Sequence, residues 1–402
     1  MTPPRINLSS SEGTTPQENP WISGFVQPRY TLRCHPVTLE TVAFAGQTPF
    51  MRWDDPLAAL AWMSMTFPAS TGRWIGHINY DLGRLFEQLP SRAAEDLRLP
   101  LFHFTFCTPR QERSAVPDPT YERSDQPLTS SFTRRGYEAA VRKCLDYIAA
   151  GDVFQINLSQ RLNVGLADDP ARIYQRLVRE APARYGALLS YGDYAIISNS
   201  PELFLHVTSD RRVITRPIKG TRPRSDGMEQ ELRESTKDEA ELNMIVDLER
   251  NDLGRVCEIG SVGVAEPRAI ETHPTVYHGV ATIEGQLRED VGFVDLLRAT
   301  FPGGSITGAP KIRAMQIIEE LEPLRRGPYC GAIGYLAADG SMQFNIAIRT
   351  MIVRHGLIHI PVGGGIVADS SPAAEYEETL VKARAMLSAV GVEESEVHRL
   401  RE

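Results

Sequence analysis

The chain has 402 residues, of which 42% are hydrophobic and 23% are charged, and its formal net charge is -8. These values are typical of a folded globular protein and exclude a fibrous or largely disordered one. The negative charge disfavours a general affinity for nucleic acid or for an anionic membrane, because both require a concentrated positive surface. A small acidic substrate remains compatible with it, since such a ligand needs only a local positive pocket.

The cysteines and the apolar segments are typical of a cytoplasmic protein. The five cysteines are scattered, without a CxxC pair or a zinc-type Cys/His spacing, so we expect reduced thiols. We find no stretch of about 18 apolar residues, and no apolar core of a signal peptide near the first residue. We therefore expect no membrane span, no membrane partner and no nucleic-acid partner.

Composition divides the chain into four regions. Residues 1–20 are rich in Pro, Ser, Thr and Glu and are predicted to be a disordered tail. Residues 21–130 form an N-terminal region, which ends in a polar, proline-containing connection that begins near Thr108. The main body of the chain is expected over residues 131–392, followed by a C-terminal tail at 393–402.

The region from residue 131 begins with a predicted helix and strand. Apolar residues from Tyr137 to Ile148 recur with helical spacing, and Gly151 follows as a stop signal. The next segment, VFQINLSQRL, alternates with period two, which predicts a strand with Gln155 on its polar face.

Two later segments, PELFLHV and QFNIAIRTMIV, alternate in the same way and are also predicted to be strands. The first places Glu202 on one face, and the second places Gln343, Asn345 and Arg349 together. These faces indicate either one shared pocket or an antiparallel sheet with one side in solvent.

A single lysine stands out in the segment TRPIKGTRPR. Lys219 lies between a proline-stiffened strand end and a Gly-Thr turn. A lysine fixed in this way can act as a nucleophile or base if partial burial lowers its pKa. The alternative is an ordinary solvated lysine in a turn.

Two acidic segments with helical spacing are candidates for a metal site. The first, STKDEAELNMIVDLERNDLGRV, carries Glu241, and the second, SPAAEYEETLVKA, carries Glu375, Glu378 and Lys382 on one face. If the two helices face one another they can hold Mg2+, a hard ion that takes one or two carboxylates and keeps positions for water and substrate. The alternative is two solvated helix faces.

Two glycine-rich segments, FPGGSITGAPK and VGGGIVADSSP, are predicted to be loops that each precede a helix. Exposed amides in such loops bind carboxylate or phosphate. Neither has the GK[ST] ending of a Walker A loop, and no serine-hydrolase elbow or zinc motif occurs, which disfavours nucleotide binding and hydrolysis.

Taken together, these segments resemble the chorismate-utilising enzyme family, whose members include anthranilate, aminodeoxychorismate, isochorismate and salicylate synthases. The motifs that carry the resemblance run in family order: GDVFQINLSQR, SPELFL, PIKGTRPR, KDEAELNMIVDLERNDLGRV, HGVATIEGQL, FPGGSITGAPK, YCGAIGY, FNIAIRT and GGGIVADSSPAAEYEET. The earlier WIGHINYDLGRLFEQLP is similar to the N-terminal half of the aminating members. The resemblance implies an α+β sandwich of two large antiparallel-rich sheets covered by helices, with the active site between the sheets.

The resemblance also implies roles for individual residues. Mg2+ is expected to bridge Glu241, Glu378 and the ring carboxylate of chorismate, with Glu375 in support through water, and Glu202 is expected to be the general acid. Chorismate is a dianion, and the groups expected to bind its carboxylates and ring are Tyr329, Arg349, Lys382, the amides of Gly363, Gly364 and Gly365, and Gly220 with Thr221.

Two positions indicate which family reaction to expect. Members that activate water carry a lysine where this chain has Gln155, so a neutral glutamine favours ammonia as the nucleophile. Lys219 resembles the PIKGT of C4-aminating members, in which the lysine forms a covalent intermediate, whereas C2-aminating members typically read PIAGT. The resemblance therefore implies amination of chorismate at C4, in p-aminobenzoate and folate biosynthesis.

Two rivals remain: amination at C2 with loss of pyruvate, and a non-catalytic subunit that only binds an amidotransferase. The chain lacks an amidotransferase cysteine motif, so ammonia is expected from a separate glutamine amidotransferase subunit. No motif of the family's tryptophan site is evident, which leaves tryptophan binding without support.

Overall fold

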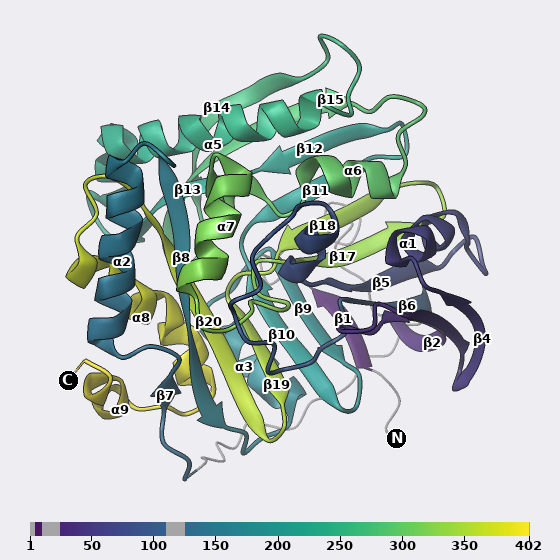
Figure 1. Ribbon diagram of the computed structural model, residues 1–402, viewed down its shortest axis with the longest axis horizontal. Coiled ribbons are helices and arrows are strands. Elements are labelled where there is room, and N and C mark those ends of the chain that lie inside the picture. Colours follow the sequence, from purple (N-terminus) through teal and green to yellow (C-terminus); the bar gives the residue numbers. More distant parts are fainter. Residues whose placement is uncertain (1–4, 10–24, 110–124, 402) are drawn as a thin grey trace.

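Two antiparallel sheets form the centre of the computed structural model, which describes residues 5–9, 25–109 and 125–401 (Figure 1). The 8-stranded sheet contains, in spatial order, β1 (Arg5–Ser9), β9 (Tyr185–Ser190), β10 (Tyr194–Ser200), β19 (Thr350–Arg354), β20 (Leu357–Ile366), β8 (Gln155–Gly165) and β16 (Gly308–Ala309), and β7 (Thr129–Ser130) also pairs with β8. The 12-stranded sheet contains β13 (Ile218–Pro223), β15 (Val276–Gln286), β12 (Arg212–Arg216), β11 (Leu203–Val207), β18 (Met342–Ile346), β17 (Ala332–Ala337), β5 (Arg73–Ile78), β6 (Phe102–Pro109), β2 (Phe25–Cys34), β3 (Thr41–Ala45) and β4 (Thr48–Trp53), and β14 (Gly263–Thr272) also pairs with β15.

Helices cover the outer faces of both sheets. Those that pack on the 8-stranded sheet are α2 (Arg134–Ala149), α3 (Pro170–Glu180), α7 (Lys311–Leu321) and α8 (Pro372–Ala389). The others are α1 (Pro56–Met65), η1 (Tyr80–Leu85), α4 (Met228–Glu234), α5 (Thr236–Gly254), α6 (Phe293–Thr300), η2 (Gly304–Ile306) and α9 (Glu394–Arg399). The expected α+β sandwich is confirmed.

Strand β8 shows how the sequence pattern builds this sandwich. Its even positions, such as Ile156 and Leu158, are buried with α2 and α8, as a two-residue period requires. Its odd positions, Gln155, Asn157 and Ser159, are buried on the opposite face. A separate apolar cluster with members from both sheets, including Leu189 and Ile333, fills the layer between them.

The N-terminal part belongs to the same body. Strand β5 pairs with β17 along its whole length, and β1 pairs with β9. The predicted helices near 137–148, in the segment around Glu241 and in the segment around Glu378 are confirmed as α2, α5 and α8.

Two predictions about chain organisation are wrong. QFNIAIRTMIV is not one strand but two, β18 and β19, which belong to different sheets because the chain turns at Arg349, whose φ is 50°. The second glycine-rich segment is not a loop, because Gly363, Gly364 and Gly365 lie inside β20 and pair with β8. Glycine at 363 lets the two backbones approach closely, because a Cβ there would lie 2.6 Å from the Leu158 carbonyl oxygen.

Both predicted tails also contain structure. Residues Arg5–Ser9 form β1, whose alternate side chains are buried and whose backbone pairs with β9. Residues Glu394–Arg399 form α9, and the Tyr376 hydroxyl donates to the Leu400 carbonyl at 2.6 Å, which docks this end on α8. The remainder of the first tail and most of the connection after Thr108 lie outside the described residues.

None of the helices in the described part of the chain combines the length and the apolar character needed to cross a membrane. All five cysteines are buried and unpaired.

Candidate active site

Lys219 lies on an irregular stretch of an edge strand. Between Ile218 and Thr221 the pairing of β13 with β15 shifts by one residue, which marks a β-bulge at Lys219 and Gly220. Gly220 has a φ of 80°, a conformation that favours glycine. Bulges of this kind redirect a side chain away from the regular pleat.

The Lys219 amine faces acidic groups from three directions. Burial lowers its pKa, while the carboxylates of Glu241 on α5, Glu202 before β11 and Glu378 on α8 oppose that fall and Lys382 adds to it. Lys219 is therefore a partly buried amine within the electrostatic reach of carboxylates on both acidic helices, and it lies in a strand and not in a turn.

Helix α8 places its carboxylates against the glycine strand. A Cβ placed on Gly364 would lie 3.2 Å from Oε2 of Glu375 and 3.3 Å from Oε1 of Glu378. Lys382 donates to the Gly363 carbonyl at 3.0 Å and pairs with Glu378 at 2.6 Å. Over residues 360–366, β20 has β8 as its strand partner on one side only, so in this part of the described fold its other edge faces the helices.

The carboxylates differ in the direction of their pKa shifts. Burial raises the pKa of Glu241 and of Glu375. Nearby lysines lower the pKa of both groups in part, and a hydrogen bond from Ser370 also lowers that of Glu375. Burial also opposes ionisation of Glu378, but Lys382 outweighs it and lowers the pKa of Glu378. One Glu375 oxygen, Oε2, is buried without a hydrogen-bond partner among the described residues.

Glu202 has the properties of a proton donor. Its residue is 4% exposed. Burial raises its pKa from 4.5 to about 7, while Ser305 and Lys219 limit the rise. A carboxyl group with a pKa near 7 can release a proton to a leaving group at neutral pH.

Arg349 is a cation without a partner in the described structure. Its side chain makes no hydrogen bond or ion pair there, and burial lowers its pKa while Tyr329 opposes the fall. Its φ of 50° is unusual for a residue other than glycine, and such backbone strain concentrates at functional sites. An unpaired guanidinium in this setting is suited to a carboxylate ligand.

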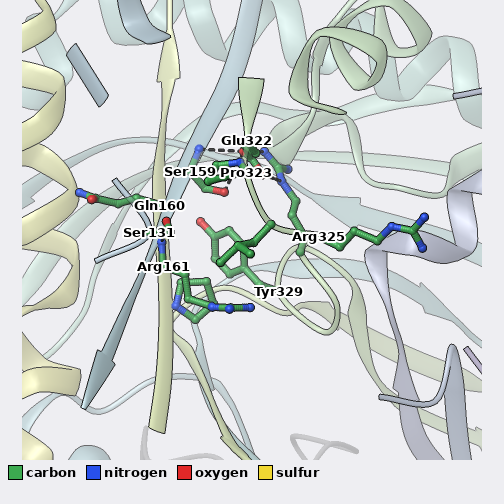
Figure 2. A pocket seen from close by; sticks show the side chains of 11 residues that line it. Ser131, Ser159, Gln160, Arg161, Glu322, Pro323, Arg325 and Tyr329 are labelled. Carbon is green, nitrogen blue, oxygen red and sulfur yellow. Dashed lines mark hydrogen bonds and ion pairs between the residues drawn. The ribbon is translucent and has the colours of Figure 1, made fainter. Parts of the chain in front are cut away.

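Tyr329 is held close to a buried ion pair (Figure 2). Glu322 accepts from the Ser159 backbone and hydroxyl, each at 2.8 Å, and from Arg326 at 2.7 Å. Tyr329 borders the same small pocket as Ser159 and Glu322. Burial raises the Tyr329 pKa well above its usual value, so its hydroxyl stays neutral and able to donate.

Gln155 is the clearest unsatisfied group in this region. It is fully buried, and neither its amide oxygen nor its amide nitrogen has a hydrogen-bond partner among the described residues. A Cβ on Gly365 would lie 3.2 Å from its amide carbon. Since buried polar groups are normally hydrogen-bonded, this amide indicates a position for a ligand.

His278 was not predicted as a site residue. Its Nδ1 lies 2.9 Å from the Thr221 hydroxyl, and Arg349 contributes to the lowering of its pKa. Burial is the main cause and lowers the pKa to about 3, so His278 is a neutral imidazole. Its only signal in the sequence is its place at the start of the HGVATIEGQL motif.

The structure thus brings every predicted site residue into one connected region. Lys219 links Glu202, Glu241, Glu378 and Lys382; Lys382 and the glycines link Glu375 and Gln155; and Arg349 links Tyr329, His278 and Thr221.

The residues fit Mg2+, although no three His, Cys, Asp or Glu side chains in the described ranges converge as a ready-made metal cage. Glu241, Glu375 and Glu378 supply hard oxygen donors, and the Oε2 atom of Glu375 lacks a partner. Magnesium commonly takes one or two protein carboxylates and completes its shell with water and substrate oxygens. Such a site does not require a third carboxylate in place.

The sandwich brings together a lysine amine, two carboxylate-bearing helices and an arginine without a partner among the described residues, a set of groups that suits a small carboxylate ligand. The chorismate binding enzyme model matches residues 38–388, and the chain belongs to that family. It is a chorismate-utilising enzyme.

The named relatives fall into two groups. The chain is 41% identical over 367 residues to anthranilate synthase component 1 of Thermus thermophilus, covering 82% of this chain and 79% of that one. It is 40% identical over 387 residues to aminodeoxychorismate synthase component 1 of Salmonella typhimurium, covering 87% and 85%. A crystal structure of anthranilate synthase component I from Streptococcus pneumoniae has a TM-score of 0.78 and 29% identity, covering 95% of this chain and 92% of that one.

Proposed function

We propose that this enzyme replaces the 4-hydroxyl group of chorismate with an amino group, giving 4-amino-4-deoxychorismate, a precursor in p-aminobenzoate and folate biosynthesis. The observation that carries the proposal is the position of Lys219, whose amine faces Glu202, Glu241 and Glu378 and has a lowered pKa. A lysine in this state can act as a nucleophile because more of it is uncharged.

The substrate-binding groups follow from the charges. Arg349, Tyr329 and Lys382 would hold the two carboxylates of chorismate together with the amides of the glycine strand. Arg349 suits a bidentate pair with a carboxylate, and its side chain has no competing partner among the described residues. Gly220 and Thr221 would lie at the ring beside Lys219.

Glu241 and Glu378 would hold Mg2+, with Glu375 in support. When bound, the ion would neutralise the ring carboxylate and fix the ring's position between the helices.

The reaction divides into two displacements. In the first, the Lys219 nitrogen forms a bond to C2, both ring double bonds shift, and the C4–oxygen bond breaks as Glu202 protonates the departing hydroxyl to water. The proton that the bonded Lys219 nitrogen loses returns Glu202 to its acid form. In the second, ammonia forms a bond to C4, the double bonds shift back, and the C2–nitrogen bond to Lys219 breaks. The proton lost from the ammonia nitrogen passes to the departing Lys219 nitrogen, so the enzyme is restored and chorismate and ammonia give product and water.

Gln155 supports ammonia as the nucleophile. Its buried amide cannot accept a proton as a lysine amine would, so it cannot activate water as a base. Its unpaired oxygen can instead accept a hydrogen bond from ammonia. We propose that a separate glutamine amidotransferase subunit supplies this ammonia.

The rival reaction is amination at C2 followed by loss of pyruvate, which is favoured by the anthranilate synthase names among the relatives. Incubation with chorismate, Mg2+ and ammonium at alkaline pH, with separation of the products by chromatography, tests the choice. We expect 4-amino-4-deoxychorismate. Anthranilate with stoichiometric pyruvate as the main product would reject the proposal, and no turnover would favour the non-catalytic rival.

A further inference from the structure

The strand that carries Lys219 has a free edge and an interrupted ladder. Strand β13 lies at the end of the 12-stranded sheet and pairs only with β15 in the described part of the fold. Its bulge at Lys219 and Gly220 removes regular pairing at the residue that must be aimed most accurately. The strand ladder alone therefore does not fix the direction of the Lys219 side chain.

Close contacts constrain the bulge from its other sides, and one of them is Leu232, whose Cδ1 would lie 2.6 Å from a Cβ on Gly220. A Cβ on Gly279 of β15 would lie 2.6 Å from the Lys219 carbonyl oxygen, so this glycine lets the bulged backbone sit against its partner. A Cβ on Gly220 would lie 2.8 Å from Cγ of Asp238, so the Asp238 side chain rests directly on the bulge.

Arg222 links the strand that carries Lys219 to helices α4 and α5. It lies three residues after Lys219 and donates to Asp238 at 3.0 Å and to Glu231 on α4 at 2.8 Å. Asp238 lies one helical turn before Glu241 on α5, so the ion pair ties the lysine strand to the helix that carries a proposed magnesium ligand. The Arg222 and Asp238 side chains are 25% and 16% exposed, whereas Glu231 is 52% exposed.

We propose that the Arg222–Asp238 ion pair is the positioning element that directs the Lys219 amine at the chorismate ring and thereby favours amination at C4 over C2. This inference rests on the proposed function. Asp238 contacts the bulge at Gly220 and Arg222 holds Asp238, and neither is among the proposed substrate ligands, so they act through Lys219. If Lys219 is displaced, its attack on C2 slows and ammonia competes for the same carbon.

The central test is Asp238→Asn, which removes the charge but keeps the side chain that rests on Gly220. Two quantities are measured: the rate of the covalent Lys219 adduct, by intact-protein mass spectrometry with chorismate, Mg2+ and no ammonia, and the ratio of C4 to C2 products with ammonium. We expect the adduct rate to fall by on the order of 10- to 100-fold, since small displacements of reacting groups have effects of that size. The C2 product should rise, and the chorismate KM should change less than about twofold, because the proposed carboxylate ligands are untouched.

Controls separate positioning from folding. Glu231→Gln removes the exposed partner of Arg222 and should leave the adduct rate near wild type. Arg222→Gln should behave like Asp238→Asn, and Arg222→Lys, which keeps a cation opposite Asp238, should recover much of the adduct rate. Thermal denaturation of each variant reports whether it is folded.

The outcomes are distinct. Folded Asp238→Asn and Arg222→Gln enzymes with wild-type adduct rates and product ratios would overturn the inference while leaving the proposed function intact. A wild-type enzyme that forms no adduct and releases the C2 product would overturn the proposed function, and the inference with it.

Discussion

The Lys219 amine and the Glu241 carboxylate lie close enough that each shifts the pKa of the other. Glu241 opposes the fall of the Lys219 pKa that burial causes, and Lys219 opposes the rise of the Glu241 pKa. Strand β13 and helix α5 are therefore coupled electrostatically. A substitution of Lys219 or of Glu241 should shift the pKa of the other residue.

Replacement of Lys219 by alanine should change the product and not merely slow the reaction. Without the amine, the covalent step is lost and ammonia is expected to enter at C2, so anthranilate should become the main product in assays with ammonium. Lys237→Ala is the matched control, because Lys237 is a nearby lysine that is 52% exposed and paired with Asp369 at 3.1 Å. An unchanged product from Lys219→Ala would contradict the covalent mechanism.

Replacement of Glu241 by glutamine should weaken magnesium binding. The neutral amide removes one charged oxygen ligand, so calorimetric titration with Mg2+ in the presence of chorismate should show an affinity lower by 10-fold or more, on the order of 1–3 kcal/mol. Glu239→Gln, on the same helix and 54% exposed, should titrate like the wild type. Equal affinities in all three proteins would remove Glu241 from the metal site.

The rate should depend on pH through Glu202. Its pKa of about 7 predicts that kcat falls as pH rises above neutrality, because the general acid loses its proton. Glu202→Gln should reduce kcat by roughly 100- to 10,000-fold below pH 7, and by less at alkaline pH, where the wild-type carboxyl has itself lost its proton. A kcat for the wild type that stays constant from pH 6 to pH 9, with product release excluded as the limiting step, would argue against this role.

Glu202 should also reduce stability at alkaline pH. Its pKa is raised on folding, so the folded state holds a proton that the unfolded state releases, and this contribution to stability is lost as pH rises from 4.5 through 7. Glu202→Gln should therefore raise the denaturation midpoint more at pH 8 than at pH 5. A midpoint difference that does not depend on pH would contradict this account.

Gly363 should not tolerate a side chain. A Cβ there would lie 2.6 Å from the Leu158 carbonyl oxygen and would push β20 away from β8. We expect Gly363→Ala to cost about 1–3 kcal/mol in urea unfolding and to raise the chorismate KM. Gly254→Ala is the control, because a Cβ at Gly254 meets nothing within 4 Å and alanine favours a helix by up to about 1 kcal/mol.

A buried histidine network should make the fold sensitive to acid. The Tyr194 hydroxyl lies 3.0 Å from Nε2 of His77 and 2.7 Å from Nδ1 of His103, and Nδ1 of His77 lies 3.1 Å from the Asn79 carbonyl oxygen. Since that oxygen only accepts, His77 donates to it and accepts from Tyr194, which in turn accepts from His103. Both histidines are neutral in the folded protein, because burial lowers the pKa of each well below 6.5.

Burial lowers the pKa of His77 to about 3, below its value of 6.5 in an unfolded chain. The unfolded state then binds more protons, so stability present above pH 6.5 is lost as pH falls toward 3. One such histidine accounts for about 2 kcal/mol between pH 7 and pH 5. Urea unfolding measures the free energy of unfolding at these two pH values. Between pH 7 and pH 5 this free energy should fall by about 2 kcal/mol less in His77→Gln than in the wild type. An equal fall in both proteins would show that another group causes the acid sensitivity.

The sequence alone determined the main elements and the candidate chemistry. Helical spacing located α2, α5 and α8, because each buries one face, and period-two alternation located β8 for the same reason. Residue type and motif order selected Lys219, Glu202, Glu241, Glu378 and Arg349. Local pattern failed where a backbone changes direction at one residue, as at Arg349, or where strand pairing stabilises a short segment, as at Arg5–Ser9.

Only the tertiary structure decided whether those residues act together. The sequence around Lys219 does not predict that its amine lies near Glu241 and Glu378. The bulge at Gly220 depends on pairing with β15 and on contact with Asp238, which lies on helix α5. The same holds for Gln155, whose buried and unpaired amide results from packing against Gly365 in another strand. The pKa of a side chain depends on its burial and on the charges around it, and both come from residues far apart in the chain. Only the folded structure brings these residues together.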